Sequence, residues 1–170
     1  MLANPETYTL FLECHRLFYY DNGALVRKIT TGSSASAGSR VGCSRGLKYP
    51  QVRVLSKGHS AHRIIYLLQQ GWLPEQVDHI NGDISDNRIE NLRAATHAQN
   101  QQNRKLQSNN ASGVKGVYFN KLQKQWVAQI NHNKKRTHLG CFFNLEDAAA
   151  AVRQFREQHH GEFANHGVQT

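Results

Sequence analysis

Residues 77–103, VDHINGDISDNRIENLRAATHAQNQQN, form the stretch from which the fold and the function of this chain are predicted. We predict a short strand over 77–80 that enters a loop, and a returning strand over 92–95. A Gly-Asp pair between them is typical of a turn. Thr96 fits a helix N-cap, and Gln99 three residues later completes a capping box. We therefore expect a strand, a loop, a returning strand and a helix.

Side chains suited to metal-assisted hydrolysis recur along this stretch. Asp78 and His79 are adjacent, Asn91 follows the aspartate by thirteen positions, and Asn100 lies nine positions further on. A hard cation such as Mg²⁺ takes oxygen ligands and keeps several waters, so one carboxylate and one amide oxygen suffice when phosphate oxygens fill other positions. A neutral imidazole beside the cation can take a proton from an attacking water. The spacing predicts a metal-dependent nuclease site.

The text DHINGDISDNRIENLRAATHAQNQQN resembles the His-Asn-His (HNH) nuclease motif, in the variant of phage and intron homing endonucleases that ends in Asn. The resemblance implies that Asp78 and Asn100 bind the metal and that His79 is the general base. It gives Asn91 the role of holding the loop and orienting His79. Common HNH enzymes carry His at the last metal position, so His97 is a rival ligand to Asn100.

The segment before the motif, SAHRIIYLLQQG, has the pattern of a helix over 60–71. Ser60 fits its N-cap, Gly71 fits its C-terminal end, and the isoleucines and leucines between them form one apolar face. His62 lies on this helix and is interpreted as a packing or phosphate-facing residue, with a role as metal ligand as the alternative.

The first 58 residues are predicted to be mostly β. TYTLFLE and RLFYYDNGALVRKI are interpreted as strands, the second broken by a hairpin turn at Asp-Asn-Gly, and KYPQVRVL as a further strand. TTGSSASAGSR, rich in glycine and serine, indicates a flexible loop or long turn. The basic run after Asn103, RKLQSNNASG, reads as a linker whose Arg104 and Lys105 can follow a DNA backbone.

Residues 112–166 are predicted to form a second unit. GVYFN, QWVAQIN and RTHLGCF are three short β segments, and the middle one alternates apolar and polar side chains around Trp126. Asn144 fits the N-cap of a following helix, and Gly161 lies beyond its end. The prediction is a three-stranded sheet with one helix on one face, leaving the other face for a partner.

This second unit resembles the Apetala-two/ethylene-response-factor DNA-binding domain, through GVKGVYFNKLQKQWVAQI, RTHLGCFFNLEDAAAA and HGEFAN. The resemblance implies that amide side chains of the sheet read base edges while cationic ones contact phosphates. Plant domains carry arginine or tryptophan at several of the matching positions, so base preference does not carry over. The residues placed on the DNA-facing sheet are Lys115, Tyr118, Asn120, Gln129, Asn131, Arg136 and His138.

The charge of the chain supports a polyanionic partner. The net charge is +9, and the basic residues flank an acidic island between Glu75 and Glu90. This arrangement is typical of a chain that binds phosphate backbones on both sides of a cation site. The three cysteines are far apart and odd in number, which favours reduced thiols over a disulfide or zinc framework. No apolar run long enough for a membrane span and no signal-peptide pattern is seen.

We expect an α+β protein with four segments: a β-rich region over 1–58, a ββα-metal (His-Me finger) nuclease core over 59–105, a linker over 106–111 and an Apetala-two-like domain over 112–166. The predicted function is a free-standing phage HNH homing endonuclease that uses Mg²⁺ or Mn²⁺ and acts on double-stranded DNA. It is expected to be a monomer in the host cytoplasm without an obligate protein partner. The alternative is a DNA-binding regulator with a decayed nuclease core, and a basic RNA-binding protein is a third hypothesis.

Overall fold

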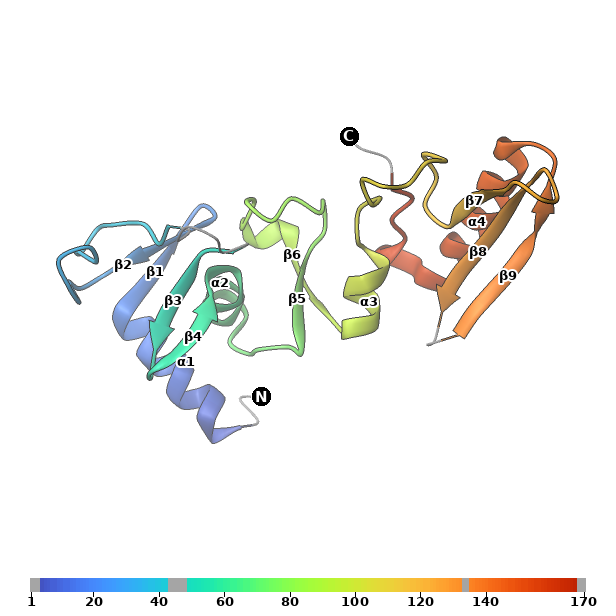
Figure 1. The fold of residues 1–170 in the computed structure, drawn as a ribbon. Coiled ribbons are helices and arrows are strands. Elements are labelled where there is room, and N and C mark those ends of the chain that lie inside the picture. The colour runs from blue at the N-terminus through green and yellow to red at the C-terminus, as the bar shows by residue number, and fades with distance from the viewer. Residues whose placement is uncertain (1–3, 43–48, 133–134, 168–170) are drawn as a thin grey trace. The chain divides into compact units, whose positions relative to one another are not determined.

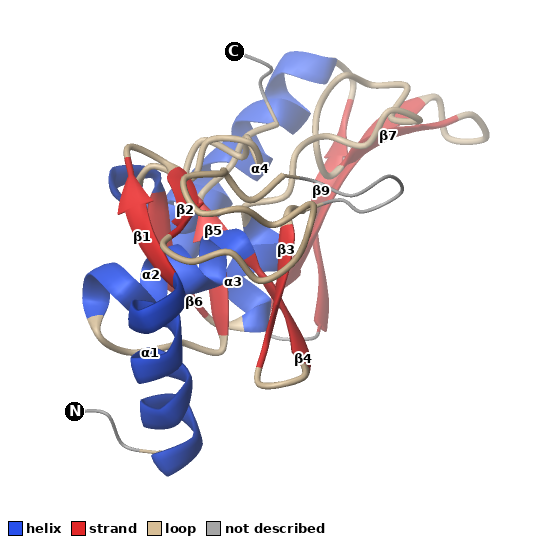
Figure 2. Cartoon of the chain, turned by 90° about the vertical axis from the view of Figure 1, so that its left-hand side faces the viewer, coloured by secondary structure: helices blue, strands red, loops and turns tan. Residues whose placement is uncertain are grey.

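The computed structural model describes residues 4–42, 49–132 and 135–167. Contacts divide the chain between Thr96 and His97 into two compact units, and short antiparallel strands alternate with helices along both of them (Figures 1 and 2). This mixed α and β content agrees with the predicted class. The division falls before the predicted linker, because α3 (His97–Gln102) and the residues that follow it contact the second unit.

The first unit is organised around helix α2 (Ala61–Gln70). Ile64, Ile65 and Leu67 on this helix have no exposed surface. The helix contacts most of the other helices and strands of the unit (Figure 1). Gly71 ends it in the left-handed conformation at φ 75°, as its C-terminal glycine predicts. The elements around α2 are α1 (Pro5–Leu17), β1 (Phe18–Asp21), β2 (Ala24–Arg27), β3 (Gln51–Val54), β4 (Lys57–Ser60), β5 (Gln76–His79) and the short 3₁₀ turn Ile89–Asn91.

The predicted strand TYTLFLE is wrong, because this segment lies in α1. Asn4 accepts a hydrogen bond from the backbone N–H of Glu6 at 2.9 Å, and Pro5 occupies the first helical position. These are strong start signals for a helix. Leu10, Cys14 and Leu17 then face the core at helical spacing. The β-branched and aromatic side chains of the segment favour a strand, but the cap at Asn4 and Pro5 starts a helix instead. Residues 1–58 are therefore less β-rich than predicted.

The two predicted strand regions that follow are confirmed. β1 and β2 form a hairpin whose turn residues, Asn22 and Gly23, have φ of 40° and 87°, as a type I′ turn requires. β3 pairs with β4 through a second hairpin. The predicted strand over 48–55 begins at Lys48, which lies outside the described residues, as do Cys43 and Arg45.

The second unit is a three-stranded antiparallel sheet with one helix against it, as predicted. The sheet consists of β7 (Val117–Asn120), β8 (Gln125–His132) and β9 (Lys135–Phe142), and α4 (Leu145–His160) contacts all three strands. Asn144 accepts a hydrogen bond from the Asp147 N–H at 2.9 Å and so caps α4. The core between them consists of Val117, Ala128, Ile130, Ala148 and Val152.

The loop over 103–116 is held to this unit by two cationic side chains, one buried and one partly buried. Arg156 of α4 is 2% exposed and donates to the Lys115 carbonyl oxygen at 2.6 Å. Lys115 Nζ in turn donates to the carbonyl oxygens of Gln102 and Arg104, at 2.8 and 2.6 Å. Burial lowers the pKa of Lys115 to about 8, with Arg156 and Arg104 adding to the effect. Lys115 thus connects the end of α3 to the start of the sheet.

Candidate active site

β5 and β6 (Leu92–Ala95) pair antiparallel and hold the predicted catalytic residues on a short hairpin. In this register Asp78 lies opposite Arg93, and His79 lies opposite Leu92. Arg63 of α2 fixes the entry to β5, because its guanidinium donates to the carbonyl oxygens of Pro74 and Glu75 at 3.1 and 2.9 Å. The hairpin is therefore anchored to the central helix of the unit.

Asp78 is buried and paired with a cation. Its carboxylate Oδ2 accepts hydrogen bonds from Arg93 Nε at 3.0 Å and from the terminal guanidinium nitrogen at 2.9 Å. The side chains of Asp78 and Arg93 are only 6% and 10% exposed. Such a pair is strongly held, because removing either partner leaves the other charge in a poorly solvated place. Arg93 therefore fixes the position of the carboxylate predicted to bind metal.

His79 is 5% exposed and is held by an asparagine of the loop. His79 Nε2 lies 2.9 Å from Asn87 Oδ1. With Nε2–H donating to that oxygen, the neutral imidazole carries its lone pair on Nδ1. The ring also stacks on Tyr49, with centroids 6.2 Å apart and planes 9° apart. Together these contacts set both the tautomer and the orientation of the ring.

His62 lies beside His79 in the same buried group. The two ring centroids are 5.1 Å apart, and His62 also packs on Tyr49 with centroids 4.8 Å apart. Burial lowers the pKa of His62 to about 3, and His79 and Arg63 add smaller effects of the same sign. His62 is thus neutral at the pH at which imidazoles act as bases, and its position fits the packing interpretation.

Asn91 closes the loop between the two strands. Its side-chain oxygen accepts from the Asn81 N–H at 3.0 Å, and its amide donates to the Asp86 carbonyl oxygen at 2.7 Å. Its own carbonyl oxygen accepts from the Ile80 N–H at 2.9 Å. Asn91 therefore holds the loop, and a hydrogen bond joins His79 to Asn87 of the same loop.

The acidic loop residues Asp83 and Asp86 bind neighbouring residues of the loop. Asp83 accepts from the backbone N–H and the hydroxyl of Ser85 at 2.9 and 2.7 Å. Asp86 forms a bidentate pair with Arg88, and this guanidinium holds the pKa of the Asp86 carboxyl well below its usual range. These contacts make the loop rigid. Among the residues with described positions, no group of three or more His, Cys, Asp and Glu side chains is arranged to hold a metal ion.

Comparison with known protein families gives a match over part of the chain. Residues 59–102 match the HNH endonuclease family model. This segment is therefore similar to an HNH endonuclease domain. That domain supports nuclease activity in general and implies DNA binding, and the matched range contains α2, both strands and α3.

A curated relative comes from a phage. The chain is 28% identical over 110 residues to Protein 3.8 of Escherichia phage T7, which covers 64% of this chain and 90% of the phage protein. No solved structure matches the chain. No helix in the described part of the chain has the length and apolar character to cross a membrane.

The remaining predicted site residues lie in the second unit. Asn100 is half-buried in α3, and His97 at the start of that helix is exposed. Arg104 and Lys105 follow α3 and are exposed. The pairing of Asn100 with Asp78 stays a prediction, because these residues belong to different units.

A β-bulge decides which residues of the sheet share the face away from α4. Register shifts between Ala128 and Gln129, so that Gln129 pairs with His138 and Asn131 with Arg136. Residues paired across antiparallel strands share a face. Tyr118 and Asn120 belong to the same face, since Val117 and Ala128 on the other face pack against α4. All the predicted DNA-facing residues except Lys115 therefore lie on or beside one face.

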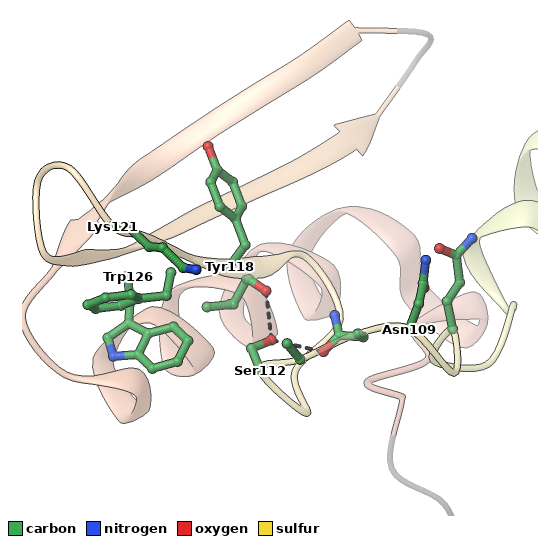
Figure 3. Close-up of a pocket in the computed structure, with 10 residues that line it drawn as sticks. Asn109, Ser112, Tyr118, Lys121 and Trp126 are labelled. Carbon is green, nitrogen blue, oxygen red and sulfur yellow. Dashed lines mark hydrogen bonds between the residues drawn. The ribbon is translucent and has the colours of Figure 1, made fainter.

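A groove of about 640 Å³ lies at the β7 edge of the sheet, between the strand and the loop that precedes it (Figure 3). Trp126 and Phe119 form an edge-to-face pair there, with centroids 5.0 Å apart. Ser112 anchors the loop by donating to the Val117 carbonyl oxygen at 2.6 Å. The groove is lined by Gln107, Asn109, Asn110, Ala111, Ser112, Val117, Tyr118, Phe119, Lys121 and Trp126.

Arg93 and Asn87 were missed from the sequence, and of these two residues only Arg93 had a signal. Arg93 was counted only as one basic residue, yet pairing the two predicted strands would have placed it opposite Asp78. Asn87 was assigned to plain loop. Its burial and its contact with His79 come from a chain reversal that no spacing rule predicts.

Proposed function

We propose that this chain is a divalent-metal-dependent DNA endonuclease of the HNH type, and that it is a free-standing phage homing enzyme. The observation that carries the proposal is the buried Asp78-His79 pair inside the segment that matches the HNH family model. A solvated Asp-His turn would expose both side chains, whereas here each is held by a specific partner, Arg93 or Asn87. Catalytic groups need this kind of fixed orientation.

The oxygen donors fit a hard cation. In the proposed ββα-metal arrangement Asp78 supplies a carboxylate oxygen and Asn100 an amide oxygen, and this pair suits Mg²⁺ or Mn²⁺ better than a softer metal. Among the described residues no group of three or more His, Cys, Asp and Glu side chains could hold a metal ion, so a phosphate of DNA and water would complete the coordination. When bound, the cation would stabilise negative charge on the scissile phosphate and on the leaving oxygen.

His79 acts as the general base in this proposal. Its Nε2–H donates to Asn87 Oδ1, so the proton from the attacking water goes to Nδ1. Asn87 and the stacked ring of Tyr49 keep the imidazole from rotating while it accepts that proton. Asn91 keeps the loop closed above the strands. The water attacks phosphorus and the 3′-oxygen leaves, so one site cuts one strand.

The second unit supplies DNA binding. Gln129, Asn131, Arg136 and His138 share one sheet face by register, and a sheet of this size can enter the major groove. Between Arg104 and Leu145 the chain contains no Asp or Glu, so the face presents amides and cations to the phosphates. This arrangement agrees with the resemblance to the Apetala-two-like domain. Lys115 enters the proposal as a residue that positions the sheet, given its carbonyl contacts.

Supercoiled plasmid tests the proposal directly. We expect the full-length protein to convert it to nicked circles in Mg²⁺ or Mn²⁺ and to leave it intact in EDTA. Plasmids that carry a panel of phage and host sequences should be tested, because an enzyme with a narrow recognition site would leave an arbitrary plasmid uncut. Binding without cleavage on every target would instead support a DNA-binding regulator with a decayed nuclease core. Chelator-insensitive binding to RNA alone would support the RNA-binding hypothesis.

Asn87→Ala is expected to lower the cleavage rate by about 10- to 100-fold, because the partner that orients a catalytic imidazole has effects of this size. DNA affinity should not change, since the Asn87 side chain is buried inside the loop and does not face solvent. The measurement is single-turnover cleavage across a range of pH. The control is Asn81→Ala, an exposed asparagine of the same loop. Unchanged rate and pH profile in Asn87→Ala would remove this role.

Arg136→Ala is expected to weaken DNA binding by about tenfold. The slope of log affinity against log salt concentration should become shallower by about one, which corresponds to the loss of one phosphate contact. Arg136 is exposed and pairs with Asn131 on the proposed binding face. The matched control is Arg153→Ala, which removes the same charge from the exposed side of α4. Fluorescence anisotropy over a salt series measures both quantities. Equal effects of the two substitutions would show that only net charge matters.

A further inference from the structure

The turn between β7 and β8 presents an apolar side chain to solvent. Leu122 is 96% exposed, although a leucine with no partner is unfavourable in water. Phe143, 86% exposed, follows β9 at the same end of the sheet, because Trp126 pairs with Phe142 there. Both side chains are thus available to a partner that approaches this end of the sheet.

The turn is held in one conformation by its own side chains. Asn120 Oδ1 accepts from the backbone N–H groups of Leu122 and Gln123, at 3.0 and 3.2 Å, and Asn120 Nδ2 donates to Gln123 Oε1 at 3.0 Å. Lys124 completes the turn with a left-handed φ of 52°. A turn fixed in this way loses little conformational freedom on binding, so the Leu122 side chain is presented ready for contact.

The charges around Leu122 are positive and favour an anionic partner. Lys121 and Lys124 flank it and are exposed, and no acidic residue occurs between Arg104 and Leu145. A second copy of this end would bring like charges together. A phosphate backbone would instead meet a lysine on each side of an apolar tip. Leucine and phenylalanine side chains that enter a base step between cationic contacts unstack and unwind duplex DNA.

We propose that Leu122 is a wedge that inserts between base pairs of duplex DNA, with Lys121 and Lys124 on the flanking phosphates. The inference rests on the proposed DNA-binding function of the second unit and adds local unwinding to it. Asn120, expected from the sequence to read bases, is then a positioning residue that holds the turn. Unwinding at one end of the sheet would make the duplex easier to deform for the nuclease domain of the same chain.

Topoisomerase relaxation of plasmid in EDTA tests the wedge without cleavage and without a known target. Full-length protein bound before relaxation should leave a deficit in linking number after it is removed. Leu122→Ala should reduce that deficit by at least about half. Its DNA affinity should fall by no more than about tenfold. Leu122→Phe should keep the deficit. Asn120→Ala should lower it as well, because the turn is no longer held.

The control is Leu55→Ala, a 50% exposed leucine in a turn of the first unit, which should leave the deficit unchanged. Bound protein that causes no deficit, or a Leu122→Ala variant that unwinds like the wild type, overturns the wedge but not DNA binding. Absence of DNA binding overturns both. Self-association in sedimentation that is lost in Leu122→Ala, without unwinding by the wild type, would show that a second copy occupies the site.

Discussion

His79→Ala is expected to lower the rate of plasmid nicking by about a thousandfold, because general-base catalysis contributes on this scale. The loss should appear in the rate of a single turnover and not in DNA affinity, since the buried imidazole lies below the surface of the hairpin. Single-turnover cleavage with saturating protein, followed on agarose gels, measures it. Added imidazole should restore part of the rate if the only missing element is a base.

The control for His79 is His97→Ala, which removes an exposed histidine at the start of α3. This substitution should change the rate by less than about threefold if Asn100 is the ligand, because an exposed histidine that binds neither the metal nor the substrate has little effect. A large loss in His97→Ala with no loss in Asn100→Ala would make His97 the ligand. Cleavage by His79→Ala at the wild-type rate would rule out the general-base assignment.

Asp78→Asn is expected to reduce cleavage by at least about a thousandfold, because it removes the only carboxylate assigned to the cation. It should also destabilise the first unit by about 3 kcal/mol, since it takes the counter-charge from the buried guanidinium of Arg93. Thermal unfolding in EDTA measures the stability. Thermal unfolding in Mn²⁺ should show a rise in Tm for the wild type that the variant lacks.

A double variant separates these two roles of the carboxylate. Asp78→Asn with Arg93→Gln removes both charges, so most of the lost stability should return, while cleavage should stay absent. If the double variant cuts DNA in Mn²⁺, Asp78 has only a structural role. An equal Mn²⁺-dependent rise in Tm for the wild type and Asp78→Asn would place the cation elsewhere.

Much of the local structure followed from short patterns. The Asp-Asn-Gly turn, the helix that ends at Gly71 and the cap at Asn144 were all predicted correctly, because each depends on backbone preferences of a few neighbouring residues. The start of α1 could have been predicted by the same means from Asn4 and Pro5. The β-branched and aromatic residues of that segment favour a strand, whereas the cap before them favours the helix that forms.

The site divides in the same way. Asp78, His79 and Asn91 were predicted as site residues from their identity and spacing, because the loop that joins them is local and its turns have strong signals. Asn87 and Tyr49 could not be identified, since their contacts with His79 depend on how the loop and a distant segment pack against α2.

The amino-acid order alone was enough to specify the chemistry available to this protein: a carboxylate, an imidazole and amides at nuclease spacing, flanked by cations. Folding settled which atoms hold those groups in place. Burial of Asp78 against Arg93, the tautomer of His79 set by Asn87, and the bulge that places His138 beside Gln129 all arise from contacts between different strands and loops. Such contacts depend on packing across elements, and no periodicity or spacing within one segment encodes them.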